Sequence, residues 1–283
     1  MKPIAEQTIL ITGATDGLGK ATALALAKLG ARVLIHGRDE GRLAATKAEI
    51  TAESGNDKLE TCKANLASLA EVRHLAYAVQ AGHEQLHMLI NNAASGGGKP
   101  GDPQRDLSVD GYELRFAVNY LASFLLTQLL LPSLKAGAPS RIINVSSAGQ
   151  YPINFDDVMM EQHYEPLDAY RQSKLAQILY TFDLAERVRG DGITVNALHP
   201  ASLMPTKMVH EYFGRTMDSL EDGVNSVMHL ATDPGLDGVT GKYFDHQQET
   251  RANDQAYDAK ARLRLWELSM ELTDAEKIDF VPD

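Results

Sequence analysis

Cysteine, basic residues and long apolar runs are scarce in the sequence, and each scarcity argues against a class of protein. Among 283 residues there is one cysteine, Cys62, so an internal disulfide and a cysteine-based metal site are both excluded. Basic residues are outnumbered, with 27 lysines and arginines against 38 acidic residues. The net charge of −11 argues against nucleic acid or an anionic membrane surface as a partner, although a local basic pocket for a phosphate is compatible with it.

Long apolar runs are also missing. A membrane-spanning helix needs roughly 18 or more consecutive apolar residues. The most apolar stretch, residues 121–134, is interrupted by Ser123, Thr127 and Gln128. Residues 1–12 lack the charged, apolar and small-residue segments of a secretory signal. We therefore expect a soluble, cytoplasmic protein with no membrane partner.

Short apolar runs alternate with longer helical segments along the chain, which is 44% hydrophobic. The expected strands are residues 7–12, 32–36, 58–63, 86–90, 141–145, 193–197 and 242–244. The expected helices are residues 20–30, 39–53, 69–81, 109–134, 167–189 and 254–272. This alternation predicts right-handed βαβ units in one domain over residues 1–283. The expected fold class is α/β, a Rossmann-type doubly wound parallel sheet of about seven strands with helices on both faces.

A glycine-rich turn joins the first expected strand to the first expected helix. Gly13, Gly17 and Gly19 follow the spacing G-x-x-x-G-x-G, with Asp16 and Leu18 between them. Glycines there permit positive φ and let the backbone approach a pyrophosphate at the helix N-terminus. A tight turn alone could use the same glycines, but the position between strand and helix favours a dinucleotide site.

Tyr170 and Lys174 lie four residues apart in an expected helix, so their side chains share one helix face. A free tyrosine titrates near pH ~10, and a neighbouring ammonium group favours the phenolate and lowers that pKa. Such a pair can serve as a proton donor near neutral pH. The chain has ten tyrosines, so the value of the pair depends on the motifs around it.

Taken in order, these motifs resemble those of the short-chain dehydrogenase/reductase family. The ordered set comprises the T-G-x-x-x-G-x-G turn, Asn91-Asn92-Ala93-Ala94, Val145-Ser146-Ser147 and Tyr-x-x-x-Lys. The match runs from about Thr8 to Phe244. Leu198-His199-Pro200 and the residues around Tyr170 are similar to the retinol dehydrogenase and WW-domain oxidoreductase-like branch.

The resemblance implies a catalytic group of four residues. Tyr170 is implied as the general acid/base, which protonates the carbonyl oxygen in the reducing direction. Lys174 is implied to lower the tyrosine pKa and to bind the nicotinamide ribose, and Ser147 to hold the substrate oxygen. Asn119 matches the asparagine that supports a water relay to the lysine, although it could instead be a helix residue bonded to backbone.

The end of the second expected strand bears on the choice between NADP and NAD. NAD-binding members place a carboxylate there, whereas this chain has Gly37 followed by Arg38, whose guanidinium suits a phosphate. This favours NADP. Two observations keep NAD open: Arg38 could pair with Asp39 or Glu40, and Asp16 puts a negative charge in the glycine turn.

The resemblance implies a cofactor set that combines the glycine turn with later strand ends. Three positions depart from the family pattern: Asn65 replaces an aspartate beside the adenine, Ala201 replaces a glycine, and Thr206 comes one residue late. An asparagine can still accept a hydrogen bond from the amino group. The expected cofactor residues are Gly13, Asp16, Gly17, Leu18, Gly19, Arg38, Asn65, Leu66, Asn91, Ala93, Tyr170, Lys174 and Thr206.

Three stretches are expected to line the substrate, residues 94–106, 149–164 and 201–214. Their apolar candidates, each of which could equally pack in the core, are Met159, Met160, Leu203, Met204, Met208 and Phe213. No metal is expected, because no partner stands at metal-ligand spacing from His163, His199 or His210. His199 is expected to pack beneath the active site.

The C-terminal residues 254–272 are expected to form an amphipathic helical extension that caps the pocket or extends an oligomer interface. The resemblance implies a two-fold interface of the helices at residues 109–134 and 167–189, in a homodimer or homotetramer, although monomers also occur in this branch.

The sequence thus predicts an NADP(H)-dependent oxidoreductase that interconverts a carbonyl and an alcohol on a small to medium, partly apolar substrate. One alternative is an NAD-dependent alcohol dehydrogenase of the same family. Another is a catalytically silent nucleotide-binding sensor or scaffold, which has no chemical need for all four catalytic residues. An epimerase or dehydratase of the extended branch is a third, but the G-x-x-G-x-x-G turn usual there is absent.

Overall fold

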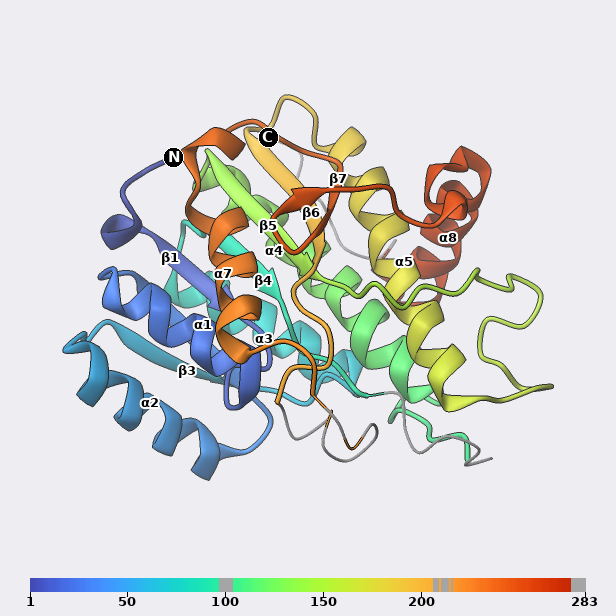
Figure 1. Ribbon diagram of the computed structural model, residues 1–283, viewed down its shortest axis with the longest axis horizontal. Coiled ribbons are helices and arrows are strands. Elements are labelled where there is room, and N and C mark those ends of the chain that lie inside the picture. Colours follow the sequence, from blue (N-terminus) through green and yellow to red (C-terminus); the bar gives the residue numbers. More distant parts are fainter. Residues whose placement is uncertain (97–103, 206–208, 210–213, 215, 276–283) are drawn as a thin grey trace.

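A computed structural model describes residues 1–96, 104–205, 209, 214 and 216–275. Within these residues, eight strands form one sheet in the order β3-β2-β1-β4-β5-β6-β7-β8 (Figure 1). The chain therefore starts in the sheet interior, winds to one edge, returns and winds to the other edge. The strands are β1 (Thr8–Ile11), β2 (Arg32–Gly37), β3 (Leu59–Lys63), β4 (Met88–Asn91), β5 (Ser140–Val145), β6 (Ile193–His199), β7 (Lys242–Asp245) and β8 (Gln248–Glu249).

The seven predicted strands are parallel to one another, and the additional short strand β8 pairs antiparallel with β7. The predicted α/β doubly wound fold is confirmed. Because all seven parallel strands point the same way, their carboxyl ends meet at one edge of the sheet. Any site built there collects residues from distant parts of the sequence.

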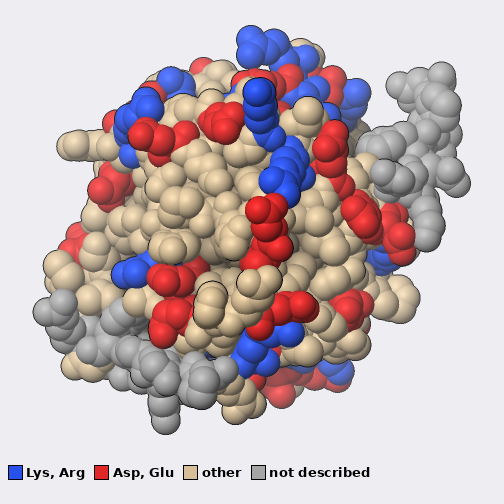
Figure 2. Space-filling view, turned by 90° about the vertical axis from the view of Figure 1, so that its right-hand side faces the viewer, with Lys and Arg blue, Asp and Glu red and all other residues tan. Residues whose placement is uncertain are grey.

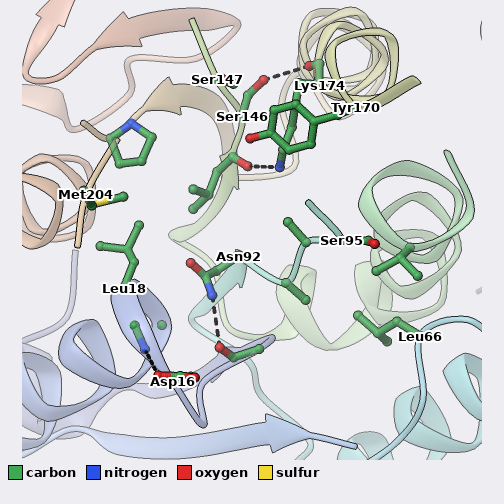
Figure 3. A pocket seen from close by; sticks show the side chains of 18 of the residues that line it. Asp16, Leu18, Leu66, Asn92, Ser95, Ser146, Ser147, Tyr170, Lys174 and Met204 are labelled. Carbon is green, nitrogen blue, oxygen red and sulfur yellow. Dashed lines mark hydrogen bonds between the residues drawn. The ribbon is translucent and has the colours of Figure 1, made fainter. Parts of the chain in front are cut away.

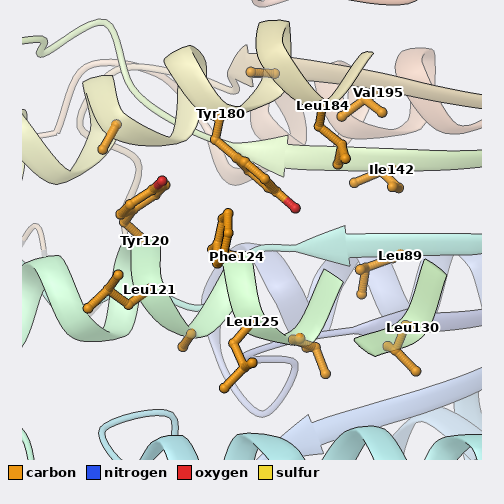
Figure 4. Packing of buried hydrophobic residues seen from close by; sticks show 14 of the residues in the cluster. Leu89, Tyr120, Leu121, Phe124, Leu125, Leu130, Ile142, Tyr180, Leu184 and Val195 are labelled. Atoms are coloured by element: carbon orange, nitrogen blue, oxygen red, sulfur yellow. The ribbon is translucent and has the colours of Figure 1, made fainter. Parts of the chain in front are cut away.

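Helices cover both faces of the sheet. They are α1 (Gly17–Lys28), α2 (Glu40–Ser54), α3 (Leu69–Gly82), α4 (Ala122–Ala136), α5 (Pro166–Arg187), α7 (Leu220–Thr232) and α8 (Ala259–Leu272). Strand side chains alternate between the two faces. Ile9 and Ile11 pack with α1, α2 and α7, whereas Leu10 and Leu89 pack with α3, α4 and α5. Figure 4 shows part of the second cluster, with Leu89, Phe124 and Tyr180. Each face thus has its own apolar core.

Two helix predictions differ from the structure. The helix expected from residue 109 starts later, because residues 108–112 form a turn in which Gly111 has φ +85° and Asp110 accepts a bond from Leu69 N. Residues 116–121 then form a π-helix that leads into α4. The helix expected over residues 254–272 is divided at Asp258, whose side chain caps α8.

Helix α7 was not predicted. Its N-terminus is a capping box, in which the Ser219 side chain and the Asp222 side chain each bind the backbone of the other. The sequence pattern Ser-x-x-Asp before an amphipathic segment was the signal that could have revealed it.

Among the described residues, one helical segment, Phe116–Ala136, is long and apolar enough to cross a membrane, and 83% of its most apolar window is buried in the protein. Its polar side chains bind neighbouring elements: Thr127 accepts a bond from Asn91, and Gln128 donates to Tyr180 (2.9 Å). Buried core helices pass the same test of length and composition. The absence of a membrane partner therefore stays a prediction.

Helix α8 packs across α4 and α5. The Trp266 ring lies 5.3 Å from that of Phe124 and 6.2 Å from that of Tyr180, and the Arg187 guanidinium stacks on it at 3.7 Å. On the face that α5 and α8 present, acidic and basic side chains are interspersed around an uncharged area (Figure 2). Part of the surface expected for a two-fold interface is thus occupied by α8, and the oligomeric state stays a prediction.

Candidate active site

A pocket of about 660 Å³ lies at the carboxyl ends of the parallel strands. It lies where the strand order reverses between β1 and β4, the usual ligand position in a doubly wound sheet. The predicted residues that it brings together are Gly13, Asp16, Gly17, Leu18, Gly19, Arg38, Asn65, Leu66, Ala93, Ser147, Tyr170 and Lys174. Asn91 and Asn119 do not line it, and Thr206 lies outside the described residues.

The glycine turn is packed too closely for side chains. Gly13 has φ +65°, and a Cβ there would lie 2.8 Å from the Ala93 Cα atom. A Cβ on Gly19 would overlap the Asn92 side chain and the Gly13 carbonyl oxygen. The turn and the start of α1 thus leave an open backbone cradle that fits a pyrophosphate, with the helix N-terminus favouring negative charge.

Asn92, and not Asn91, is the asparagine on the pocket side. The Asn92 amide nitrogen donates to Thr12 O (2.9 Å) and Gly13 O (3.2 Å), which fixes the start of the glycine turn. The Asn91 amide nitrogen instead donates to Thr127 and Asn144. The Asn91 side chain points away from the pocket, because successive strand residues point to opposite faces, and a contact between Asn91 and the cofactor stays a prediction.

His36 is a site residue that sequence reasoning missed. Its Nδ1 accepts a bond from Gly13 N (3.1 Å), and its Nε2 lies 3.1 Å from Ala64 O, so Nε2 carries the proton. Burial, opposed by the bond to Ala64, lowers the His36 pKa to about 4. The neutral ring therefore links the glycine turn to the end of β3. No local sequence motif indicates this role of His36.

Two arginines line the end of the pocket beyond the glycine turn. Arg38 is exposed, and no described residue bonds its side chain. Asp39 caps α2 through Arg42 N, and Glu40 pairs with Lys63, so neither neutralises Arg38.

Arg42 is the second arginine, and it was not predicted. Its Nη2 binds Asp16 Oδ2 at 3.0 Å and Thr15 O at 3.3 Å. The negative charge that Asp16 places in the turn is thus paired. The N-cap bond from Gly17 N to Asp16 Oδ1 (2.8 Å) holds this carboxylate beside the helix start.

Ser147, Tyr170 and Lys174 lie together on the opposite wall (Figure 3). Lys174 Nζ donates to Val145 O (2.8 Å) at the end of β5 and to Gln177 Oε1 (3.0 Å), and it lies 5.8 Å from the Tyr170 ring centre. Ser146 Oγ donates to Lys174 O (2.7 Å). The strand end and α5 therefore fix these groups against each other.

The electrostatics of this group differ from the expectation that Lys174 lowers the tyrosine pKa. Burial raises the pKa of Tyr170, and the hydrogen bond from Ser147 acts against that shift. Burial also lowers the pKa of Lys174 to about 7. Of the two causes that act on the Tyr170 pKa, the hydrogen bond from Ser147 is the one that favours the phenolate.

Asn119 lies in the π-helix and is fully buried. Its Oδ1 accepts a bond from Ser95 N (2.6 Å), and its Nδ2 donates to Ser95 O (3.1 Å) and Ser173 Oγ (2.9 Å). It therefore connects Ser95, which lines the pocket, with Ser173 of α5, the residue that precedes Lys174 in the sequence. A π-helical turn is frequent at functional sites.

The substrate side is only partly as predicted. Leu203 and Met204 line the pocket, with Leu114, Val118 and Leu167, whereas Met159 packs against the apolar core and Met160 does not line the pocket. Met208, Phe213 and His210 lie outside the described residues. Among described residues, no group of three or more His, Cys, Asp or Glu could hold a metal ion, and the absence of a metal stays a prediction.

The segment after Ser147 is held by the C-terminal region. Ile153 N donates to Gln255 Oε1 (2.7 Å), and Asn253 N donates to Gln150 Oε1 (2.7 Å). The Tyr243 hydroxyl donates to Ser147 O (3.0 Å). This wall therefore depends on residues about a hundred positions away in the sequence.

A glycine cradle facing a serine, a tyrosine and a lysine in a doubly wound sheet defines a nucleotide-dependent oxidoreductase. The chain belongs to the short chain dehydrogenase family, whose profile matches residues 7–215. It is 37% identical to mouse retinol dehydrogenase 13, over 94% of this chain and 83% of the relative. The predicted family and its retinol dehydrogenase-like branch are confirmed.

Solved structures agree. An uncharacterised protein from Mycobacterium paratuberculosis has 30% identity and a TM-score of 0.79, over 96% of this chain and 94% of the other. The Pseudomonas aeruginosa RhlG/NADP active-site complex has 28% identity and a TM-score of 0.69, over 87% and 97%. The chain is therefore an oxidoreductase of this family, with a nicotinamide nucleotide as cofactor and a carbonyl/alcohol couple as its chemistry.

Proposed function

We propose that this chain is an NADP(H)-dependent oxidoreductase that interconverts a carbonyl and an alcohol on a small to medium, partly apolar substrate. The observation that carries the proposal is the convergence of the Ser147 and Tyr170 hydroxyls in a pocket whose opposite wall is the glycine cradle. In this arrangement a substrate oxygen bound by the two hydroxyls faces the cofactor.

Tyr170 is the proposed general acid/base. The nicotinamide cofactor, when bound, supplies the hydride to a carbonyl carbon or accepts it from an alcohol carbon. Tyr170 gives its hydroxyl proton to the substrate oxygen in the reducing direction and takes it back in the oxidising direction. Ser147 orients that oxygen and stabilises its developing charge. Lys174, which is held in place by its bond to Val145 O, is the proposed source of the proton that restores the Tyr170 hydroxyl.

Arg38 and Arg42 support the NADP preference. The two arginines place two guanidinium groups at the far end of the pocket. Asp16, whose negative charge favoured NAD, is paired with Arg42. Arg38 has its donors free among the described residues and suits a bidentate phosphate contact. RhlG, which is 28% identical to this chain, forms a complex with NADP, and this is consistent with the choice.

The NADP proposal is tested by Arg38→Ala. A charge-assisted contact to the 2′-phosphate is worth about 10- to 100-fold in affinity. Arg38→Ala should weaken NADPH binding by that factor and leave NADH binding within about twofold, measured by fluorescence titration. Equal losses for the two cofactors would return the choice to NAD.

The enzyme proposal is tested with a panel of aldehydes, ketones and alcohols of graded apolar size, assayed with NADPH, NADH and their oxidised forms. Turnover should be fastest with NADP(H) and with substrates that fill the wall formed by Leu114, Val118 and Leu167. Tight cofactor binding without turnover on any of them would favour the silent sensor instead.

We further propose a cytoplasmic location without a membrane partner, supported by the burial of the apolar segment Phe116–Ala136. A homodimer or homotetramer would have to use surfaces of α4 and α5 that α8 leaves uncovered. Fractionation and sedimentation of the full chain test these two statements.

A further inference from the structure

A cluster of histidine and aspartate side chains lies behind the segment that follows β6. It joins His199 at the end of β6, Ser202 on the pocket wall, Asp218 before α7, and Asp245 and His246 at the turn between β7 and β8. None of these residues belongs to the catalytic group described above. The cluster is therefore separate from the catalytic group.

Ser202 is held at three positions. Its backbone N donates to Asp218 Oδ2 (2.6 Å), and its carbonyl oxygen accepts a bond from Asp218 N (3.0 Å). Its hydroxyl lies 3.0 Å from His199 Nε2. The next residue, Leu203, has φ +45°, a conformation that an L-residue keeps only where its surroundings impose it.

His246 holds Asp218 in turn. Its Nε2 lies 3.1 Å from Asp218 Oδ2, and its Nδ1 lies 2.8 Å from Asp245 Oδ1. Its backbone N donates to His199 O (2.8 Å), and φ at His246 is +55°. Both ring nitrogens thus face carboxylate oxygens, which only accept hydrogen bonds, and only the protonated ring can donate to both.

The segment that this cluster fixes reaches the cofactor side of the pocket. Ser202, Leu203 and Met204 all line the pocket. Met204 lies against Gly223 of α7, where Leu18 of the glycine turn also packs (Figure 3). A shift of Ser202 would therefore move Met204 relative to the cradle for the cofactor.

We propose that His246 and Asp218 are positioning residues, which hold Ser202 to Met204 in the place where this segment contacts the bound cofactor. This inference rests on the proposed function in one respect, that the pocket takes a nicotinamide nucleotide. It adds a role for the turn between β7 and β8, and it makes cofactor affinity depend on the charge of one histidine.

The direction of the pH dependence follows from the groups around His246. Burial acts to lower the pKa of His246, but the hydrogen bonds to Asp245 and Asp218 outweigh it and raise this pKa. The His199 ring, at 5.6 Å, has its own pKa lowered, chiefly by burial, and the charge of Asp222 also acts on the cluster. The double contact of His246 is complete below its ordinary pKa of 6.5 and is lost as pH rises through the raised value.

The experiment uses the full-length protein and the variant His246→Gln, which removes the charge at a half-exposed position. His229→Gln is the matched control, because His229 also pairs with an aspartate, Asp233 (3.0 Å), and lies outside the pocket lining. Two quantities are measured at pH 6.0 and 8.5: hydrogen exchange of the peptide over residues 198–205 without cofactor, and the NADPH dissociation constant by fluorescence.

At pH 6.0, His246→Gln should exchange faster over residues 198–205 and bind NADPH about tenfold more weakly, since a charged hydrogen bond is lost. At pH 8.5 the difference from wild type should shrink. His246→Arg, which keeps a positive charge, should restore the affinity and flatten its pH dependence.

Exchange and affinity of His246→Gln that match those of His229→Gln at both pH values would overturn the proposal. Asp218→Asn gives an independent measurement and should speed exchange over the same peptide. If the wild type binds neither NADPH nor NADH, the proposed function fails, whereas the exchange measurement without cofactor still decides whether His246 holds this segment.

Discussion

The two walls of the pocket are built in different ways. The wall for the cofactor consists of the glycine turn and the ends of β1, β2 and β4, and its shape depends on close approaches at Gly13 and Gly19 that leave no space for a Cβ atom. The wall for the substrate consists of the segments after β5 and β6, the second of which also reaches the cofactor side, and it is held by side chains such as Gln255, Asp218 and His246. The first wall tolerates almost no added atom, whereas the second can change by exchange of one side chain for another.

The two kinds of contact differ in how they tolerate substitution. Backbone contacts allow only glycine at positions such as Gly13 and Gly19, whatever the substrate is. A side-chain contact between residues about a hundred positions apart in the sequence can be replaced by itself without disturbing the sheet. We therefore expect substitutions in the two walls to have distinct signatures.

The largest expected effect is on Tyr170, on the wall opposite the glycine turn. Tyr170→Phe removes the proton donor, so kcat should fall by about 10²–10⁴-fold, the usual contribution of a positioned acid. The NADPH dissociation constant should stay within about twofold, because the ring remains. Tyr77→Phe, at an exposed position on α3, is the control and should leave kcat unchanged. Activity retained in Tyr170→Phe would eliminate its acid/base role.

Lys174→Met should show that the catalytic group costs stability. The Lys174 pKa is about 7 in the folded chain against an ordinary 10.5, so the folded state binds fewer protons between these values and the stability of wild type rises with pH from 7 to about 10. The variant lacks this rise. At pH 6 it should be the more stable protein, by at most about 5 kcal/mol at 1.4 kcal/mol per pKa unit, while its activity is lost.

Urea unfolding of both proteins between pH 6 and 10 measures this difference. Parallel pH dependences for wild type and Lys174→Met would mean that the buried lysine keeps its ordinary pKa in the folded chain.

Gly19→Ala tests the wall for the cofactor. The new Cβ would overlap Asn92 and the Gly13 carbonyl oxygen, so we expect a loss of about 1–3 kcal/mol in stability and about 100-fold in cofactor affinity. Gly82→Ala, at the end of α3 with nothing within 4 Å of its Cβ, is the matched control and should be neutral or slightly stabilising. Similar affinities for the two variants would remove the distinction between the walls.

Trp266→Ala tests the helix packing behind the wall for the substrate. Its ring packs on Phe124, Tyr180 and Arg187, so its loss should lower the free energy of unfolding by about 2–3 kcal/mol. Cofactor affinity should not change, because α8 does not line the pocket. Leu263→Ala, exposed on the same helix, should cost less than about 0.5 kcal/mol. A weaker cofactor affinity in Trp266→Ala would show that the walls are coupled.

Predictions from the sequence succeeded where local pattern and chemistry coincide. The alternation of apolar segments gave the sheet, and the glycine turn and the Tyr170–Lys174 spacing placed their residues in the pocket. They failed where the partner is remote. Asn92, His36 and Arg42 were missed, because each is placed by a bond to a segment that is distant in the sequence.

The sequence by itself determined the fold and the family of this protein, because hydrophobic periodicity and motif spacing extend over a few residues and can be recognised without a structure. Tertiary structure alone decided which asparagine faces the pocket, that Asp16 is paired with Arg42, that burial brings the Lys174 pKa to about 7, and that His246 supports Ser202 through Asp218. These outcomes depend on burial and on contacts between segments that are far apart in the chain, and no local pattern encodes them.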